Sequence, residues 1–277
     1  MLEQRRVTVA EGVGLAVRVR EPLPSSRPPA VLVHGLASSS RLWDGVASAL
    51  DDFGHGSVAV DLRGHGQSDA PHSGYDTSTA VADVIAVVEQ TTGDRPVLLA
   101  GQSWGGNVAL QVAARRPDLV AGLALMDGGW IRLASRFADW DSARHALAPP
   151  DIDGMPAASF RSMLAPALDG FPDGSLDAAM STVRVLDDGT IQRRLSVPRH
   201  LEILYSLWQD DPRQWYPQVR ARTVLMPAVE VGAPLDPEIG AALAAIEQAR
   251  LRPFPGAHHD VHLQRPVEVA EEIGSLA

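Results

Sequence analysis

Residues 97–114 read VLLAGQSWGGNVALQVAA, and this stretch determines the fold that we expect. Its first four residues are apolar, as a strand buried on both faces requires. The motif G-x-S-x-G follows at 101–105, and the small and apolar residues after it suit a helix. Strand, motif and helix in this order predict a sharp turn that lifts Ser103 out at the edge of a sheet. Glycines flank the serine because side chains would not fit in such a turn.

The segments on either side predict a parallel sheet covered by helices. Apolar runs indicate buried strands at 30–33, 57–60, 96–100, 119–126, 223–226 and 250–254. Helical spacing or composition indicates helices at 78–91, 105–115, 238–249 and 267–276. A hairpin formed by 7–9 and 15–20 precedes them. This alternation is typical of the α/β class, with a mostly parallel central sheet flanked by helices.

The alternation of strands and helices is lost in the middle of the chain, which contains four of the six tryptophans. We interpret residues 128–219 as a mainly helical cap inserted over the carboxyl edge of the sheet. Residues 1–127 and 220–277 would then form the core, although an ordinary run of helices within one continuous domain is the alternative. As a cap, the insertion would wall a substrate pocket with Trp130, Trp208 and Trp215.

The cysteine content, the net charge and the length of the apolar runs exclude several classes of function. The 277 residues include no cysteine, which excludes disulfides, thiolate catalysis and cysteine-ligated metals. The net charge is −10, without a basic run, so nucleic-acid binding is not expected. No apolar run is long enough to cross a bilayer, and the N-terminus does not resemble a signal peptide. We therefore expect a cytoplasmic protein that acts on a small molecule, without a membrane or nucleic-acid partner; a homo-oligomer is compatible with the sequence.

The first buried strand leads into His34-Gly35-Leu36. Acyl transfer requires two backbone N–H groups aimed at the oxyanion that develops on the substrate. One comes from the residue after the nucleophile, here Trp104, and the other from a loop after an earlier strand, for which Leu36 is the candidate. We interpret the side chain of His34 as a brace for this loop.

Four motifs occur in a fixed order: HG at 34–35, DLRGHGQS at 61–68, GQSWGG at 101–106 and GAHH at 256–259. Together they resemble the α/β-hydrolase fold superfamily, and especially its capped members. That group includes esterases, lactonases, C–C hydrolases, haloperoxidase-like enzymes and dehalogenases. The resemblance covers about 30–127 and 223–277. It implies that Ser103 is the nucleophile and that His259, after the last strand, is the general base, with the preceding His258 as an alternative. It also implies that Asp61 and Arg63 brace their loop.

The acid that orients the histidine has two candidates. The family usually carries an aspartate after the strand at 223–226, but this chain has Val231 at the expected position and Glu230 beside it. Asp236 lies further along. Asp127 ends the preceding strand, where some relatives, including certain dehalogenases and lactonases, carry their acid. The two strand ends are neighbours in space, and we favour Asp127 over Glu230.

These residues predict a serine hydrolase that cleaves a carboxylic ester, a lactone or a related acyl bond through an acyl-enzyme, without a cofactor. The run His258-His259-Asp260-Val261-His262 could also suggest a metal site, but serine chemistry requires none, and we expect no metal. The alternatives are an acyltransferase, a haloperoxidase-like enzyme or a C–C hydrolase with the same triad, and a non-enzymatic binding protein with the same fold. A dehalogenase or epoxide hydrolase is disfavoured, because those enzymes carry a carboxylate where this chain has Ser103.

Overall fold

The computed structural model describes residues 2–21, 27–93 and 95–277. Its centre is an eight-stranded sheet with the strand order β1-β2-β4-β3-β5-β6-β9-β11. β2 pairs antiparallel with β1 and β4, and all other neighbours are parallel. The expected α/β class with a mostly parallel sheet is therefore confirmed. The strands are β1 Leu2–Ala10, β2 Val13–Arg20, β3 Ala30–Val33, β4 Ser57–Val60, β5 Val97–Gln102, β6 Val120–Met126, β9 Arg222–Met226 and β11 Ala249–Leu251.

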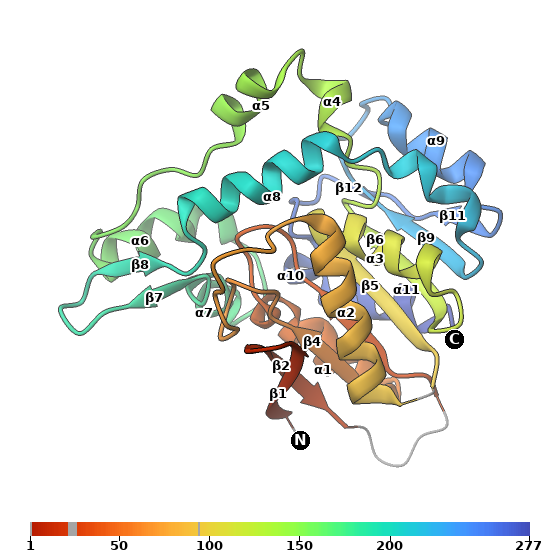
Figure 1. Ribbon diagram of the computed structural model, residues 1–277, viewed down its shortest axis with the longest axis horizontal. Helices are drawn as coiled ribbons and strands as arrows, with labels where there is room; N and C mark the ends of the chain where they lie inside the picture. The colour runs from red at the N-terminus through yellow and green to blue at the C-terminus, as the bar shows by residue number, and fades with distance from the viewer. Residues whose placement is uncertain (1, 22–26, 94) are drawn as a thin grey trace.

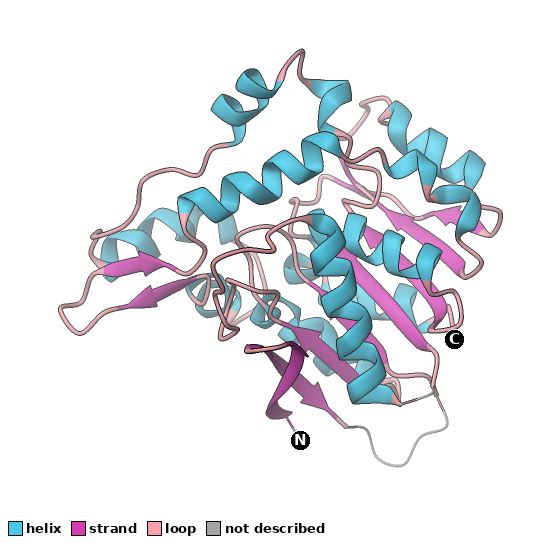
Figure 2. Cartoon of the chain, in the orientation of Figure 1, coloured by secondary structure: helices cyan, strands magenta, loops and turns pink. Residues whose placement is uncertain are grey.

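Helices cover both faces of this sheet (Figures 1 and 2). One face packs against α2 (Thr77–Thr92) and α3 (Trp104–Arg115), and the other against α1 (Asp44–Asp52) and α11 (Pro266–Gly274). Successive residues of β3 alternate between the two resulting cores, so all four are buried. Burial on both faces explains why this strand is a continuous apolar run.

Two boundaries at the C-terminal end differ from the sequence expectation. The expected helix at 238–249 ends four residues early, as α9 (Pro237–Ala245). The expected strand at 250–254 is divided into β11 and β12 (Phe254–Pro255), and β12 pairs with β10 (Ala228–Val229) outside the main sheet. Pro253 lies in the gap, and its lack of an N–H prevents a continuous ladder. Helix α1 was not anticipated.

The chain between β6 and β9 is mostly helical and extends above the sheet in Figure 1. It also contains an antiparallel hairpin, β7 (Val183–Val185) and β8 (Ile191–Arg193), which the sequence analysis did not anticipate. Its other elements are α4 Leu133–Arg136, α5 Trp140–Leu147, α6 Ala157–Leu164, η2 Ala165–Leu168, α7 Ser175–Met180, α8 Val197–Gln209, η3 Pro212–Gln214 and η4 Tyr216–Gln218. The remaining elements of the chain are η1 Ser40–Trp43 and α10 Val261–Gln264.

The segment between β6 and β9, called the insertion below, contributes to three apolar clusters. Helix α8 buries Ile203, Leu204 and Leu207 in the same apolar cluster that contains α2 and α3. Phe160, together with the hairpin, belongs to a small separate cluster. Ala178 of α7 and Leu168 of η2 pack in a third cluster with Leu42 of η1 and Leu263 of α10. Helix α8 therefore extends the core of the sheet, and α7 and η2 also pack against it. Within the described residues, every helix is too short or too polar to span a bilayer.

The loop after β4 is fixed by buried charges. Arg63 donates two hydrogen bonds of 2.7 Å each to Asp83 of α2, and the two side chains are 7% and 3% exposed. Asp61 accepts the backbone N–H groups of Ser40 and Gln67 at 2.7 and 2.8 Å. The expectation that Asp61 and Arg63 brace this loop is confirmed.

We expect Arg63→Met or Asp83→Leu alone to lower the free energy of unfolding by about 3–5 kcal/mol, because each leaves a buried charge without its partner. The double variant should cost clearly less than the sum of the two. Denaturant unfolding of the four proteins measures this coupling. Additive losses would show that the pair is not an energetic unit.

Candidate active site

Ser103 lies at a strained turn between β5 and α3. Its φ is 54°, in a region that side chains other than glycine rarely adopt. Ala37 and Asp127, with φ of 56° and 42°, complete the set of non-glycine residues with positive φ in the described chain. All three follow parallel strands at their carboxyl ends, so the backbone strain is concentrated at one edge of the sheet.

Glycines allow the backbones around Ser103 to approach one another. A Cβ atom on Gly101 would lie 2.1 Å from the carbonyl oxygen of Gly105, and one on Gly105 would lie 2.4 Å from that of His34. A Cβ atom on Gly128, in the loop after β6, would lie 2.0 Å from the carbonyl oxygen of Ser103. No side chain fits at these three positions, which is the reason the motif predicts glycine on both sides of the serine.

A histidine and a carboxylate meet at the same edge. Nδ1 of His259, in the loop after β12, lies 2.5 Å from Oδ2 of Asp127, the residue after β6. The other carboxylate oxygen of Asp127 accepts the N–H of Ala228 at 3.2 Å. Because Nδ1 donates to Asp127, the neutral ring has its lone pair on Nε2, the nitrogen that can accept a proton.

The alternative acid does not reach this histidine. Glu230 follows β10 and is exposed, and within the described chain its side chain forms no hydrogen bond or ion pair. Asp236 caps α9 by accepting the N–H of Glu238 at 2.9 Å, and it pairs with Arg136 at 2.8 Å. The structure thus brings Asp127, the favoured candidate, to His259.

The environment of His259 acts on its pKa in opposite directions. Partial burial lowers the pKa, but the hydrogen bond and the negative charge of Asp127 raise it more, and the pKa lies above its ordinary value of 6.5. His259 therefore takes up a proton more readily than a free histidine.

Within the described chain, neither of the other histidines near 259 is hydrogen-bonded to Asp127, although His258 lines the same cavity as Ser103 and His259. Nδ1 of His258 accepts the N–H of Asp260 at 3.1 Å, and its ring meets Phe171 edge-on at 5.7 Å. His262 is fully buried against Trp43, and burial lowers its pKa to about 4. Among the described residues, no three His, Cys, Asp or Glu side chains are grouped as metal ligands.

Two backbone N–H groups beside Ser103 are free to bind an oxyanion. Among the described residues, neither Leu36 nor Trp104 donates its backbone N–H to an acceptor, and that of Trp104 lies at the N-terminus of α3, where such groups are unpaired. The indole of Trp104 is buried and donates to Thr77 at 3.2 Å, so only its backbone is available.

His34 braces the loop that carries Leu36. Its Nδ1 donates to the carbonyl oxygen of Gly35 at 2.7 Å, and its Nε2 accepts the N–H of Leu62 at 3.0 Å. Complete burial lowers the pKa of His34 to about 4, so the ring is neutral. The bracing role expected for this side chain is confirmed.

Ser103 and His259 line the same cavity, which has a volume of about 390 Å³. Leu36 and Gln102 contribute to its wall from the core, and the insertion contributes mostly apolar residues: Leu164, Ala167, Leu168, Ala179 and Thr182. The cavity thus combines a mainly apolar wall with a few polar side chains, as is typical of small-molecule sites; besides Ser103 and His259, the polar lining includes Ser38, Thr182, His258 and Asp260.

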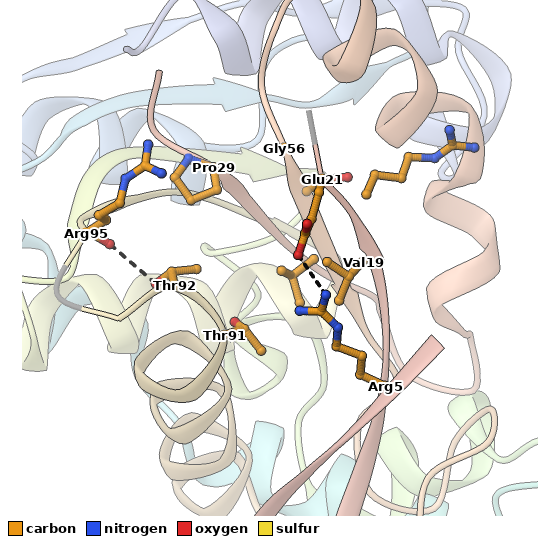
Figure 3. Close-up of a pocket in the computed structure, with 11 residues that line it drawn as sticks. Arg5, Val19, Glu21, Pro29, Gly56, Thr91, Thr92 and Arg95 are labelled. Atoms are coloured by element: carbon orange, nitrogen blue, oxygen red, sulfur yellow. Dashed lines mark hydrogen bonds and ion pairs between the residues drawn. The ribbon is translucent and has the colours of Figure 1, made fainter. Parts of the chain in front are cut away.

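A second cavity, of about 330 Å³, is shown in Figure 3. Pro29, Gly56 and Arg95 in its wall precede β3, β4 and β5, so it lies at the amino edge of the parallel strands, opposite Ser103. No histidine is among its described lining residues, and its Arg5 is neutralised by Glu21 at 2.7 Å. Ligands of such sheets bind at the carboxyl edge, which favours the cavity at Ser103.

The tryptophans expected to wall the pocket do not line the Ser103 cavity, and this expectation is corrected. Trp130 is buried in the core beside α3, and Trp215 lies under the guanidinium of Arg115 at 4.7 Å. Trp208 packs against Trp140 on the helices of the insertion, with 6.5 Å between ring centroids. The large apolar indoles serve packing here, and smaller side chains of α6, η2 and α7 form the wall.

We predict that His259 titrates above 6.5 in the Ser103→Ala protein, and that Asp127→Asn lowers this pKa by removing the charge that favours the imidazolium. NMR titration of the histidine rings measures both values. The pKa of His259 is thus higher in the folded protein than in the unfolded one. The stabilisation that the His259–Asp127 pair contributes is therefore fully present below the pKa of His259 in the unfolded protein, and it is lost as the pH rises through the pKa of His259 in the folded protein. A pKa of His259 that does not respond to Asp127→Asn would contradict the geometry.

Comparisons with known proteins agree with this architecture. The family model for the alpha/beta hydrolase fold matches residues 28–176. Lipase LipV of Mycobacterium tuberculosis is 30% identical, over 91% of this chain and 94% of the lipase. A haloalkane dehalogenase of Bradyrhizobium diazoefficiens is 31% identical, over 69% of this chain, and the match spans 59% of that protein.

Solved structures have the same fold at lower identity. The crystal structure of E-2-(acetamidomethylene)succinate hydrolase is 21% identical with a TM-score of 0.80, over 100% of this chain and 99% of the other. An esterase from Mycobacterium tuberculosis is 20% identical with a TM-score of 0.73, over 100% of this chain and 91% of the other. The chain belongs to the α/β-hydrolase fold family, as its four sequence motifs indicated.

Proposed function

We propose that this hydrolase cleaves carboxylic esters or related acyl bonds of small molecules through an acyl-enzyme on Ser103. One observation carries the proposal: Ser103, held at a strained turn, opens on the same cavity as His259, whose Nδ1 is held by Asp127. A nucleophile, a base and an orienting acid from three separate loops are the parts that this chemistry requires.

The reaction has two steps. Nε2 of His259 takes the proton of Ser103 as Oγ attacks the acyl carbon, and the backbone N–H groups of Leu36 and Trp104 donate to the oxyanion. The alcohol leaves with the proton from His259. Water then gives a proton to His259 and attacks the acyl carbon, and His259 returns this proton to Oγ of Ser103 as the bond between Oγ and the acyl carbon breaks and the acid leaves. Asp127 stabilises the charged imidazole in both steps.

The relatives include dehalogenases as well as a lipase. We place this chain with the ester-cleaving members because of the residue at the turn after β5. Resemblance to dehalogenases would imply a carboxylate nucleophile at this position, and this chain has Ser103 there. An acyltransferase with the same triad would form the same acyl-enzyme and pass the acyl group to an alcohol. Added alcohol that diverts most of the acyl group from water would favour that alternative.

A fluorophosphonate probe should add one label to the wild-type protein and none to Ser103→Ala. The wild type should also hydrolyse at least one member of a panel of p-nitrophenyl esters and lactones, and Ser103→Ala should not. Intact-mass spectrometry and nitrophenolate release give the two readouts. Stoichiometric labelling of Ser103→Ala would place the nucleophile elsewhere.

Asp127→Asn should lower kcat by about 10⁴, because the amide no longer holds the histidine tautomer in which Nε2 faces the serine. Glu230→Gln is the matched control, since it removes an exposed carboxylate one strand away, and its kcat should stay near that of wild type. Thermal melting must first show that both proteins are folded. A crippled Glu230→Gln beside an active Asp127→Asn would reverse the assignment of the acid.

A further inference from the structure

We propose that the substrate ends in a carboxylate bound by Arg194, with an apolar chain between this carboxylate and the bond that is cleaved. The inference rests on the proposed function and names the class of substrate that the site selects. It comes from a third cavity, different from the one in Figure 3, that adjoins the cavity at Ser103.

This adjoining cavity has a volume of about 270 Å³, and four residues line both it and the Ser103 cavity: Ala37, Ser38, Leu164 and Thr182. The two cavities therefore lie side by side, and the adjoining one is lined largely by residues of the insertion. Most of the additional wall is apolar, with Ile152, Phe160, Met163 and Leu195. An apolar chain that starts at Ser103 has room to continue in this direction.

Two arginines, Arg193 and Arg194, also line the adjoining cavity, and they differ in how their charge is balanced. Arg193 pairs with Asp153 at 3.1 Å and Asp151 at 3.6 Å, and it donates to the carbonyl oxygen of Pro150 at 2.8 Å. Its charge is therefore already neutralised by the protein.

Arg194 has no such partner. Its Nε donates to the carbonyl oxygen of Ser181 at 3.1 Å, and within the described chain no carboxylate lies at ion-pair distance and no acceptor faces its two terminal nitrogens. Arg194 is half-buried, and both burial and the neighbouring Arg184 lower its pKa. The negative charge of Asp61 raises the pKa of Arg194, but the two carboxylate oxygens of Asp61 already accept the backbone N–H groups of two other residues.

A half-buried guanidinium without an ion-pair partner among the described residues is costly to the free protein in a mostly apolar cavity, and a bound anion would offset this cost. Two free terminal nitrogens suit a carboxylate, which accepts from both at once. The two other basic side chains in the wall, His65 and His200, do not supply competing charge, because burial lowers the pKa of each, to about 3 for His65.

The position of Arg194 is tied to the catalytic loops. Ser181, whose carbonyl oxygen holds Nε of Arg194, also places its hydroxyl 2.7 Å from that of Ser39. Ser39 belongs to the loop after β3 that carries Leu36. The guanidinium is thus linked through Ser181 to the loop that would hold the oxyanion.

The test compares esters that differ only in a terminal carboxylate. One pair is p-nitrophenyl hexanoate and the mono-p-nitrophenyl ester of adipate, which has the carboxylate on the acyl side. The other pair is hexyl butanoate and the butanoate ester of 6-hydroxyhexanoate, which has it on the alcohol side. In at least one pair the wild type should have a kcat/KM about tenfold or more higher for the charged ester.

Arg194→Gln should abolish this preference by lowering kcat/KM for the charged ester far more than for the neutral one. Arg194→Lys should lie in between, because lysine keeps the charge but cannot bind both carboxylate oxygens in a planar, bidentate way. Arg184→Gln is the matched control: it removes the same charge from an exposed neighbour on β7 that lines neither cavity, and the preference should survive. Thermal melting verifies the fold of each variant.

The inference is overturned if the wild type does not prefer the charged ester in either pair, if Arg194→Gln slows charged and neutral esters equally, or if Arg184→Gln abolishes the preference as well. Calorimetric binding of adipate and 6-hydroxyhexanoate to Ser103→Ala, with and without Arg194→Gln, separates this result from the proposed function. Arg194-dependent binding without turnover of any ester would contradict the function alone. Turnover of neutral esters with no Arg194-dependent binding would contradict this inference alone.

Discussion

The close approach of backbones around Ser103 is the constraint on which the site depends. The loops after β3 and β6 both contact the turn after β5, at distances that leave no space for a Cβ atom on Gly105 or Gly128. The strained backbone of Ser103, which costs about 1–3 kcal/mol, is held because its N–H donates to Met126 and its carbonyl oxygen accepts from Gly106. Main-chain packing therefore sets where Ser103 lies relative to the loops that carry Leu36 and Asp127.

The other half of the site is held by fewer contacts. His259 comes from a late loop, its side chain is 50% exposed, and its link to the core is the hydrogen bond to Asp127 together with one from Gln102 to its carbonyl oxygen at 3.3 Å. The insertion supplies one side of the cavity wall, with Leu164, Ala167, Leu168, Ala179 and Thr182, and the core supplies the other. The candidate catalytic residues thus lie on the core, and the insertion contributes only to the wall of the cavity.

The sequence predicted the elements whose burial leaves a clear pattern. Strands such as β3 and β5 are apolar on both faces, and the turn at Ser103 requires glycines that can be recognised without a structure. The sequence could not show which of Asp127 and Glu230 contacts His259, because both follow neighbouring strands. In the structure Asp127 binds His259, and Glu230, after β10, is exposed to solvent. The tryptophans were wrongly expected to line the substrate pocket. A large apolar side chain indicates that a residue is buried, but it does not indicate which surface it packs against. Arg194 gave no signal in the sequence, since its significance lies in the carboxylate partners that it lacks.

The central claim is that an acyl group passes through Ser103, and rapid acid quenching tests it most directly. The wild-type protein is mixed with a p-nitrophenyl ester that it turns over, quenched on the millisecond scale, digested and analysed by peptide mass spectrometry. We predict a transient acyl mass on the peptide that contains Ser103, rising with a burst of one nitrophenolate per protein when deacylation is the slower step. An acyl group that accumulates on another residue, or turnover by a protein in which Ser103 is alanine, would contradict the account.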